Sequence, residues 1–180
     1  MTQRPGRRQR GATLIEVLVT MVIIAFGLLG MAGLQVRMQV SELESYQRSQ
    51  ALLMLSDMAS RIAANRNNAA SYVTTTGTGA TCSGTSTTAQ LDVKEWCEAL
   101  QGTNVTVGSV NKGGIVGARG CVQQLSASEY MVTVAWQGMV AISAPPASVT
   151  CGANQYDGAQ CTSDKCRRVV TTLVRIASLT

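Results

Sequence analysis

The sequence predicts an α+β protein in which the outer half of one long N-terminal helix packs on an antiparallel sheet of three or four strands, stabilised by disulfides. Three observations predict this fold. No proline occurs in residues 12–66, alternating apolar residues follow in 130–136, and six cysteines lie after residue 80. A chain of 180 residues is sufficient for one domain with a modest appendage.

The first half of the long helix has the composition of a membrane span. Residues 12–34 contain one charged side chain, Glu16, and four arginines precede them. At about 1.5 Å per residue this segment extends roughly 34 Å, enough to cross a hydrocarbon core of about 30 Å. The positive-inside rule then leaves residues 1–11 in the cytoplasm and exports the rest of the chain.

Glu16 is the unusual residue of this segment. A carboxylate at the centre of a membrane helix costs about 2.5–3.5 kcal/mol, and less near the interface. Glu16 therefore needs either hydration among lipid headgroups or a cation at a similar depth. A free amine at a newly exposed Ala12, one helical turn away, would be such a cation.

An ordinary secretory signal is an alternative interpretation of the same segment. Gly30-Met31-Ala32 could serve as a small-x-small cleavage site. Against this interpretation, the apolar stretch begins with an acid and continues without a turn cluster into a further helical pattern.

The N-terminal residues resemble a known family. An arginine-rich leader, Gly11 and the run Ala12-Thr13-Leu14-Ile15-Glu16-Val17-Leu18-Val19 resemble the class III signal of type IV prepilins. In that signal a leader ending in Gly precedes an apolar helix with Glu as its fifth residue. The run from Gly27 to Gln35 is similar to the helix of PilV-type minor pilins.

The resemblance implies that prepilin peptidase cuts between Gly11 and Ala12 and methylates the new terminus at Ala12. It implies that Glu16 acts in subunit assembly. Mature pilins commonly begin with Phe or Met, so Ala12 departs from the pattern. Many major pilins also have a proline near the position of Gly33, which this chain lacks.

The family's layout divides the chain into four parts. Residues 1–11 would be a cytoplasmic leader, 12–34 the transmembrane half of the helix, 35–66 its soluble half, and 67–180 an exported head domain. The expected protein passes once through the inner membrane with a periplasmic head, and then enters a cell-surface pilus.

The resemblance implies a minor pilin that takes part in type IV pilus assembly or priming and in pilus-dependent adhesion or motility, without catalysis. The expected partners are other minor and major pilins, prepilin peptidase, the inner-membrane assembly platform and membrane lipid. A minor pseudopilin of a type II secretion system and a membrane-tethered adhesin or binding domain are the alternatives.

The soluble half of the helix shows an apolar stripe that should pack on the head. Four residues recur at i, i+4, i+7 and i+11, and three more widen the stripe: Ala51, Leu55, Met58 and Ile62, then Leu52, Ala59 and Ala63. This periodicity is typical of an amphipathic helix. Asn65, Asn67 and Asn68 should end it, because Asn tolerates turn conformations.

The head should contain a loop, a short helix and strands in that order. Residues 74–88 are mostly Thr, Ser and Gly, a composition typical of a solvated loop. Residues 91–100 should form a short helix. The expected strands are 115–123, 130–136 and 168–176, joined through Ser126-Ala127-Ser128 and through a long excursion at 138–165 that contains Pro145-Pro146.

All six cysteines fall on the side expected to be exported, where disulfides form: Cys82, Cys97, Cys121, Cys151, Cys161 and Cys166. Six cysteines allow 15 pairings, and sequence does not select one. We favour Cys82 with Cys97, bracing the Thr-rich loop, and expect the other four to clamp the excursion against the sheet. Each disulfide should contribute about 2–4 kcal/mol.

Composition argues against several classes of site. The chain has no His, which excludes Ser-His-Asp, Cys-His and His-ligated metal sites. No Cys-x-x-Cys occurs, so we expect no metal, no cofactor and no catalytic residue. Residues 113–120 are glycine-rich but lack phosphate-loop spacing, which indicates a turn or a bulged strand.

Nucleic acid is not an expected partner. Residues 12–180 contain 11 basic and 10 acidic residues, so the chain beyond its leader lacks the electrostatic footprint of a polyanion-binding protein. One basic cluster occurs in the head, and we expect it to be a solvated sheet face, with a partner surface as the alternative: Lys165, Arg167, Arg168 and Arg175. Four aromatic residues are too few for a base-stacking platform: Trp96, Tyr130, Trp136 and Tyr156.

Overall fold

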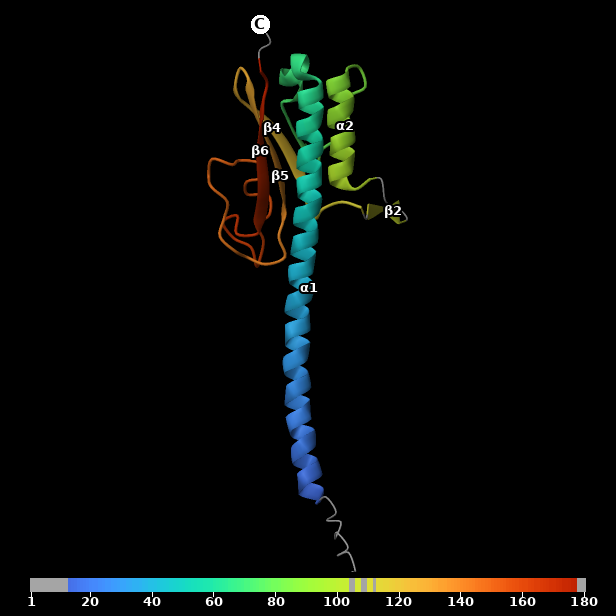
Figure 1. The fold of residues 1–180 in the computed structure, drawn as a ribbon, viewed down its shortest axis with the longest axis vertical. Coiled ribbons are helices and arrows are strands. Elements are labelled where there is room, and N and C mark those ends of the chain that lie inside the picture. The colour runs from blue at the N-terminus through green and yellow to red at the C-terminus, as the bar shows by residue number, and fades with distance from the viewer. Residues whose placement is uncertain (1–12, 104–105, 108–109, 112, 178–180) are drawn as a thin grey trace, which may run out of the picture. The chain divides into compact units, whose positions relative to one another are not determined.

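The computed structural model describes residues 13–103, 106–107, 110–111 and 113–177 (Figure 1). The chain divides into two compact units, the first ending at Glu42 and the second beginning at Leu43. Gly11 and Ala12 lie outside the described residues.

Helix α1 (Leu14–Ala64) supplies the described structure of the first unit and begins the second. It has 51 residues and no proline. It ends where the asparagines were expected to end it. Asn65 leaves the helical conformation, and the 3-10 helix η1 (Arg66–Tyr72) follows.

The second unit contains a four-stranded antiparallel sheet in the order β1-β4-β5-β6. Its strands are β1 (Thr74–Gly77), β4 (Arg119–Ser126), β5 (Glu129–Gln137) and β6 (Arg167–Arg175). Helix α2 (Thr88–Gln101) precedes a separate two-stranded hairpin, β2 (Thr106–Val107) with β3 (Val110–Asn111). The predicted fold class, a long helix with an antiparallel sheet and disulfides, is confirmed.

One face of the sheet packs on the helices. The alternating residues of β5 enter one buried cluster with the stripe of α1: Tyr130, Val132, Val134 and Trp136 with Ala51, Leu55, Met58 and Ile62. From α2, Trp96 joins this cluster, and its Nε1 donates a hydrogen bond to the carbonyl of Met54 at 2.9 Å. Gly120 of β4 makes room for the indole, because an added Cβ would lie 2.3 Å from Trp96 Cη2.

The other face of the sheet is partly covered by the excursion between β5 and β6. Tyr156 packs there with Cys121 of β4 and Ala135 of β5. Its hydroxyl donates a hydrogen bond to the carbonyl of Gly117 at 2.9 Å. The excursion therefore contributes a second, smaller core instead of extending the sheet.

Three disulfides hold these layers together. Cys82 pairs with Cys97, which ties the Thr-rich segment to α2. The excursion is tied to β4 by the second disulfide, Cys121 with Cys151. The third disulfide, Cys161 with Cys166, closes a short loop just before β6. All six cysteines are paired.

The structure corrects three expectations. The Thr-rich segment is not all loop, because its first four residues form edge strand β1, paired with β4. Thr is β-branched and suits a strand, but the loop was predicted from the Thr, Ser and Gly content of the whole segment. The apolar stripe of α1 is also narrower than expected, since Leu52 and Ala63 are exposed. Strand β4 begins at Arg119, later than the predicted residue 115.

Candidate functional site

The first half of α1 is apolar on every side. Its side chains from Thr13 to Gln39 are exposed, and the largest include Leu14 at 92% and Phe26 at 71%. An 18-residue window of this helix has a mean hydropathy of 2.5 and is not buried by the described residues. Keeping such a surface in water costs about 25 cal/mol per Å². It fits a surface that lipid or other apolar helices cover.

Glu16 lies in the first turn of α1, with an exposed side chain. Its backbone N–H donates to the carbonyl of Thr13 at 3.0 Å. The unpaired N–H groups of a helix N-terminus carry partial positive charge, which favours a carboxylate there. Because Ala12 lies outside the described residues, the ion pair between its amine and Glu16 stays a prediction.

The three glycines of this helix leave open surface. A Cβ added at Gly27, Gly30 or Gly33 would meet nothing within 4 Å. Each glycine costs about 1 kcal/mol relative to Ala in a helix, and nothing else in the described chain uses the space. The open surface would let another helix approach the backbone closely.

In the second unit, Arg61 joins α1 to α2. Its Nη1 donates to Asp92 Oδ1 at 2.8 Å and to Glu95 Oε2 at 2.7 Å, while its Nε contacts Asp57 Oδ2 at 3.0 Å. Burial acts to lower the pKa of Arg61, but its hydrogen bonds to Glu95, Asp92 and Asp57 raise that pKa above its ordinary value. Tyr72 donates to the other oxygen of Asp92. The i, i+4 spacing of Asp57 and Arg61 in the sequence indicates their ion pair. The pairing of Arg61 with Asp92 and Glu95 is not indicated, because those acids lie more than 30 residues away.

Glu44 ties the start of the excursion to α1. Its Oε1 accepts hydrogen bonds from the backbone N–H of Met139 at 2.6 Å and from Arg168 Nη2 at 3.3 Å. The same guanidinium donates to the carbonyl of Val140 at 2.7 Å. Sequence analysis missed this contact, because the partners are more than 90 residues apart.

The basic cluster of the head is solvated only in part: Lys165 and Arg175 are exposed as predicted, whereas for Arg167 and Arg168 the prediction was wrong. Arg167 is only 3% exposed, and its Nη1 donates to the carbonyls of Val149 and Cys151 at 2.6 and 3.0 Å. Its Nε lies 3.2 Å from Asp164 Oδ2, an ion-pair distance without hydrogen-bond alignment. Arg168 is bound to Glu44 as described above.

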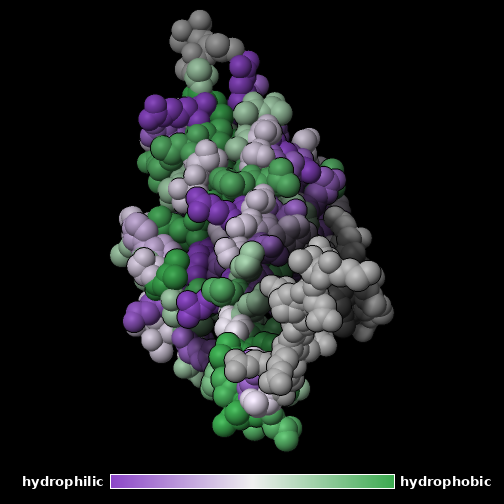
Figure 2. All heavy atoms as spheres, turned by 60° about the horizontal axis from the view of Figure 1, so that its bottom comes forward, coloured by the Kyte–Doolittle hydropathy of each residue, from purple (hydrophilic) through white to green (hydrophobic). Residues whose placement is uncertain are grey.

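Arg175, at the far end of β6, is paired with Glu129 at 2.8 Å. Of the four predicted basic residues, only Lys165 has no ion-pair partner among the described residues. Figure 2 shows hydrophilic and hydrophobic side chains interspersed over the face in view. These pairings leave little free positive charge for a polyanionic partner.

The aromatic residues of the head are buried as well. Trp96, Trp136, Tyr130 and Tyr156 all belong to the two cores. Burial raises the pKa of the Tyr156 hydroxyl to about 12. None of the four can stack on a base without unfolding part of the head.

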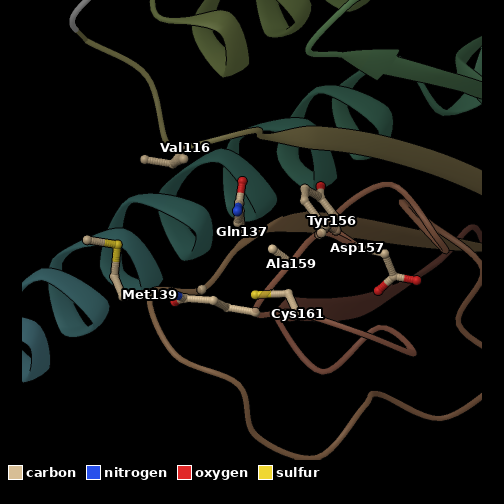
Figure 3. A pocket seen from close by; sticks show the side chains of 10 residues that line it. Val116, Gln137, Met139, Tyr156, Asp157, Ala159 and Cys161 are labelled. Atoms are coloured by element: carbon tan, nitrogen blue, oxygen red, sulfur yellow. The ribbon is translucent and has the colours of Figure 1, made fainter.

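A hollow of about 470 Å³ lies between the excursion and the end of β5 (Figure 3). Gln137, Met139, Tyr156 and Asp157 are among its lining residues. Asp157 is its one carboxylate, and Oδ1 of that carboxylate accepts the backbone N–H of Asp164 at 2.8 Å. Among the described residues, no three His, Cys, Asp or Glu side chains gather as a metal site.

Comparison with known families gives two adjoining matches. Residues 6–32 match the prokaryotic N-terminal methylation motif, and residues 33–106 match the type IV pilin Tt1218 family. No curated protein and no solved structure matched the chain. The chain is thus similar to type IV pilins over residues 6–106, and its apolar helix and α+β head fit that likeness.

Proposed function

We propose that this chain is a PilV-type minor pilin, anchored in the inner membrane by residues 12–34 and then inserted into a type IV pilus or used to prime its assembly. The observation that carries the proposal is the helix that begins at Leu14, apolar on every side, with Glu16 exposed in its first turn. The match of residues 6–32 to the methylation motif supports it, as does the similarity of Gly27 to Gln35 to PilV-type helices.

The proposed mechanism begins with cleavage by prepilin peptidase. Cutting between Gly11 and Ala12 removes the arginines of the leader and creates an amine, which is then methylated. In the filament, this amine lies beside Glu16 of a neighbouring subunit. In a medium of low dielectric, a buried carboxylate is stable only when a cation is paired with it. Because Glu16 of each subunit must reach such an amine, the pair fixes the axial position of each subunit.

The apolar side chains supply the rest of the association. Helices leave lipid and pack against one another in the filament centre, and Gly27, Gly30 and Gly33 permit close backbone approach. The platform in the inner membrane receives the processed chain. The head, on the periplasmic side, contacts other minor and major pilins and contributes to adhesion or motility, without catalysis.

Mass spectrometry of the mature N-terminus in the native host tests this proposal. We expect a chain that begins at N-methylated Ala12 and that occurs in purified pili. A chain that begins at Gly33 would show a secreted protein, and one that keeps Met1 would show a tethered binding domain. Recovery of the processed chain with secretion-system pseudopilins instead of pili would assign it to type II secretion.

A further inference from the structure

One flank of α1 in the second unit is open to solvent beside β6. A groove of about 530 Å³ runs there. Its lining residues are mostly small, and Leu52, at 46% exposure, is the largest exposed one. The groove is lined by Leu52, Leu55, Ser56, Ala59, Ser60, Ala63 and Thr172. Small side chains at i, i+3, i+4 and i+7 let a neighbouring backbone approach closely.

Two arginines that flank the groove residues in the sequence carry unpaired positive charge. Arg48 lies one helical turn before Leu52 and therefore on the same side of α1. Arg66 follows Ala63 by three residues, at the start of η1. Both arginines are exposed, and neither has an acidic partner within 4 Å among the described residues.

The opposite flank of α1 has excess negative charge. Figure 1 shows α2 on one side of α1 and β6 on the other. Three carboxylates share one cation there, because Asp57, Asp92 and Glu95 all contact Arg61. Glu98 of α2 is balanced only by Lys94, at 3.8 Å.

An apolar side chain stands beside these acids. Leu91 of α2 is 42% exposed, although α2 buries its other large apolar residues, Trp96 and Leu100. It lies one turn before Glu95 and two turns before Glu98, on one side of the helix. The α2 flank, formed by Leu91, Glu95 and Glu98, therefore has an exposed apolar side chain with acids beside it. The α1–β6 groove is a largely apolar hollow whose residues are flanked in the sequence by Arg48 and Arg66.

We propose that the α1–β6 groove of one subunit binds the α2 flank of a second copy of this chain. Leu91 would contact Leu52 and the small residues of the groove, and Glu95 and Glu98 would face Arg48 and Arg66. The proposal deepens the pilin function and rests on it for its setting in a filament. It names a surface of the head, separate from the pairing of Glu16.

The placement of the two surfaces determines the kind of assembly. The groove and the α2 flank are different surfaces on opposite sides of α1, so a contact between them is heterologous. Such a contact uses one surface on each subunit and leaves the other free, and it repeats as an open helical array unless the rotation closes it. Complementary charge steers the encounter and makes it sensitive to salt.

Site-specific photo-crosslinking of the full chain in the piliated host tests the contact. A benzophenone amino acid replaces Leu91, and the matched control replaces Leu125, which is 53% exposed at the end of β4. We expect the Leu91 probe, and not the Leu125 probe, to give a homodimer band whose cross-linked peptide contains residues 52–63. A Leu91 probe that gives no homodimer, or that attaches elsewhere, would overturn the proposal.

Charge reversal provides the second arm. Arg48→Glu should lower the Leu91 cross-link at least fivefold, and adding Glu98→Arg should restore at least half of it. Lys165→Glu, an exposed charge reversal on the excursion, is the control and should change nothing. If Arg48→Glu and Lys165→Glu have the same effect, the charges do not act as proposed.

The same cells distinguish this proposal from the pilin function. Each variant is also assayed for processing at Ala12 and for recovery in sheared pili. A processed chain present in pili without the homotypic cross-link would refute the groove contact and leave the pilin function standing. A homotypic cross-link in a processed chain that is absent from pili would support the groove contact and refute the pilin function.

Discussion

The two halves of α1 differ in what covers their apolar side chains. From Leu14 to Gln39 every side chain is exposed, and no part of the described chain covers the large apolar ones. From Leu43 onward, only one stripe of the helix is buried, and the head's own sheet and α2 cover it. The first half therefore fits a surface that lipid or other apolar helices cover, whereas the buried stripe of the second half is covered within one chain.

This difference predicts that subunit association and the stability of the head depend on different halves of α1. A change in the first half should alter association without altering the head, because the two share no core. A change in the head core should unfold the head without preventing membrane insertion, which depends on hydropathy alone. Each variant below is expected to affect one region and spare the other.

Glu16→Ala should have the largest effect. Leaving one buried charge without its partner costs about 3–5 kcal/mol, or roughly 100-fold or more in an association constant. We expect the variant to insert in the membrane normally and to be nearly absent from pili, with the thermal unfolding of the head unchanged. Co-purification with partner pilins, followed by immunoblotting, measures the loss.

Glu42→Ala is the matched control for this prediction, since it removes an exposed acid from the same helix. It should reach pili at the level of the unchanged chain. Equal incorporation of the two variants would show that Glu16 has no special part in assembly.

Removing the disulfides should act on the head alone. In the chain-entropy model the loss grows with loop length, and the three pairs are separated by 30, 15 and 5 residues. Double Cys→Ser variants should lose about 3.6 kcal/mol for Cys121/Cys151, about 3 for Cys82/Cys97 and about 2 for Cys161/Cys166. Urea unfolding of the detergent-solubilised chain gives the order. A largest loss at Cys161/Cys166 would contradict it.

Much of this head was predictable from the sequence, for physical reasons that differ between elements. The 3.6-residue period of the α1 stripe and the alternation of β5 each report one buried face, so Ala51, Leu55, Met58 and Ile62 were assigned correctly. The pair Cys82–Cys97 was favoured because it braces a loop, and the structure contains it.

The rest of the head depends on contacts between distant residues. Arg167 and Arg168 are indistinguishable from surface arginines in the sequence, because their partners Asp164 and Glu44 are fixed only by folding. Edge strand β1 was missed because its residues resemble a loop in composition. Its hydrogen-bonding partner, β4, lies more than 40 residues away. Local patterns do not encode such pairings.

Gly120→Ala should destabilise the head less than loss of the longer disulfides. The new Cβ would lie 2.3 Å from Trp96 Cη2 and 2.6 Å from Leu100 Cδ1, so the helix must shift. Overpacking of this kind costs about 2 kcal/mol. Gly158→Ala is the matched control, because a Cβ there meets nothing within 4 Å. The urea unfolding midpoints of the two variants are compared by the near-ultraviolet circular dichroism of tryptophan. Equal midpoints would show that α2 shifts to admit the new Cβ without loss of stability.

Tyr156→Phe should have the smallest effect, and only at high pH. Burial raises the pKa of Tyr156 from 10.0 to about 12, so the folded head favours the neutral phenol. That contribution is complete below pH 10 and is lost as pH rises toward 12. At pH 11 the unchanged head should have lost about 1.4 kcal/mol through this group. Tyr72, whose pKa burial and Asp92 also raise, adds to the loss in both chains.

The Tyr156→Phe variant separates the contribution of Tyr156 to this loss of stability from that of Tyr72. Tyr156→Phe should start slightly less stable at pH 8, because Gly117 loses its hydrogen-bond donor, at a cost of about 1 kcal/mol. Its unfolding midpoint should then fall less than that of the unchanged chain between pH 10 and 11.5. With all six cysteines paired, no free thiol initiates disulfide exchange in that range. Parallel declines in the two chains would show that Tyr156 ionises as readily in the folded head as in the unfolded chain, which would place the excursion off the sheet at alkaline pH.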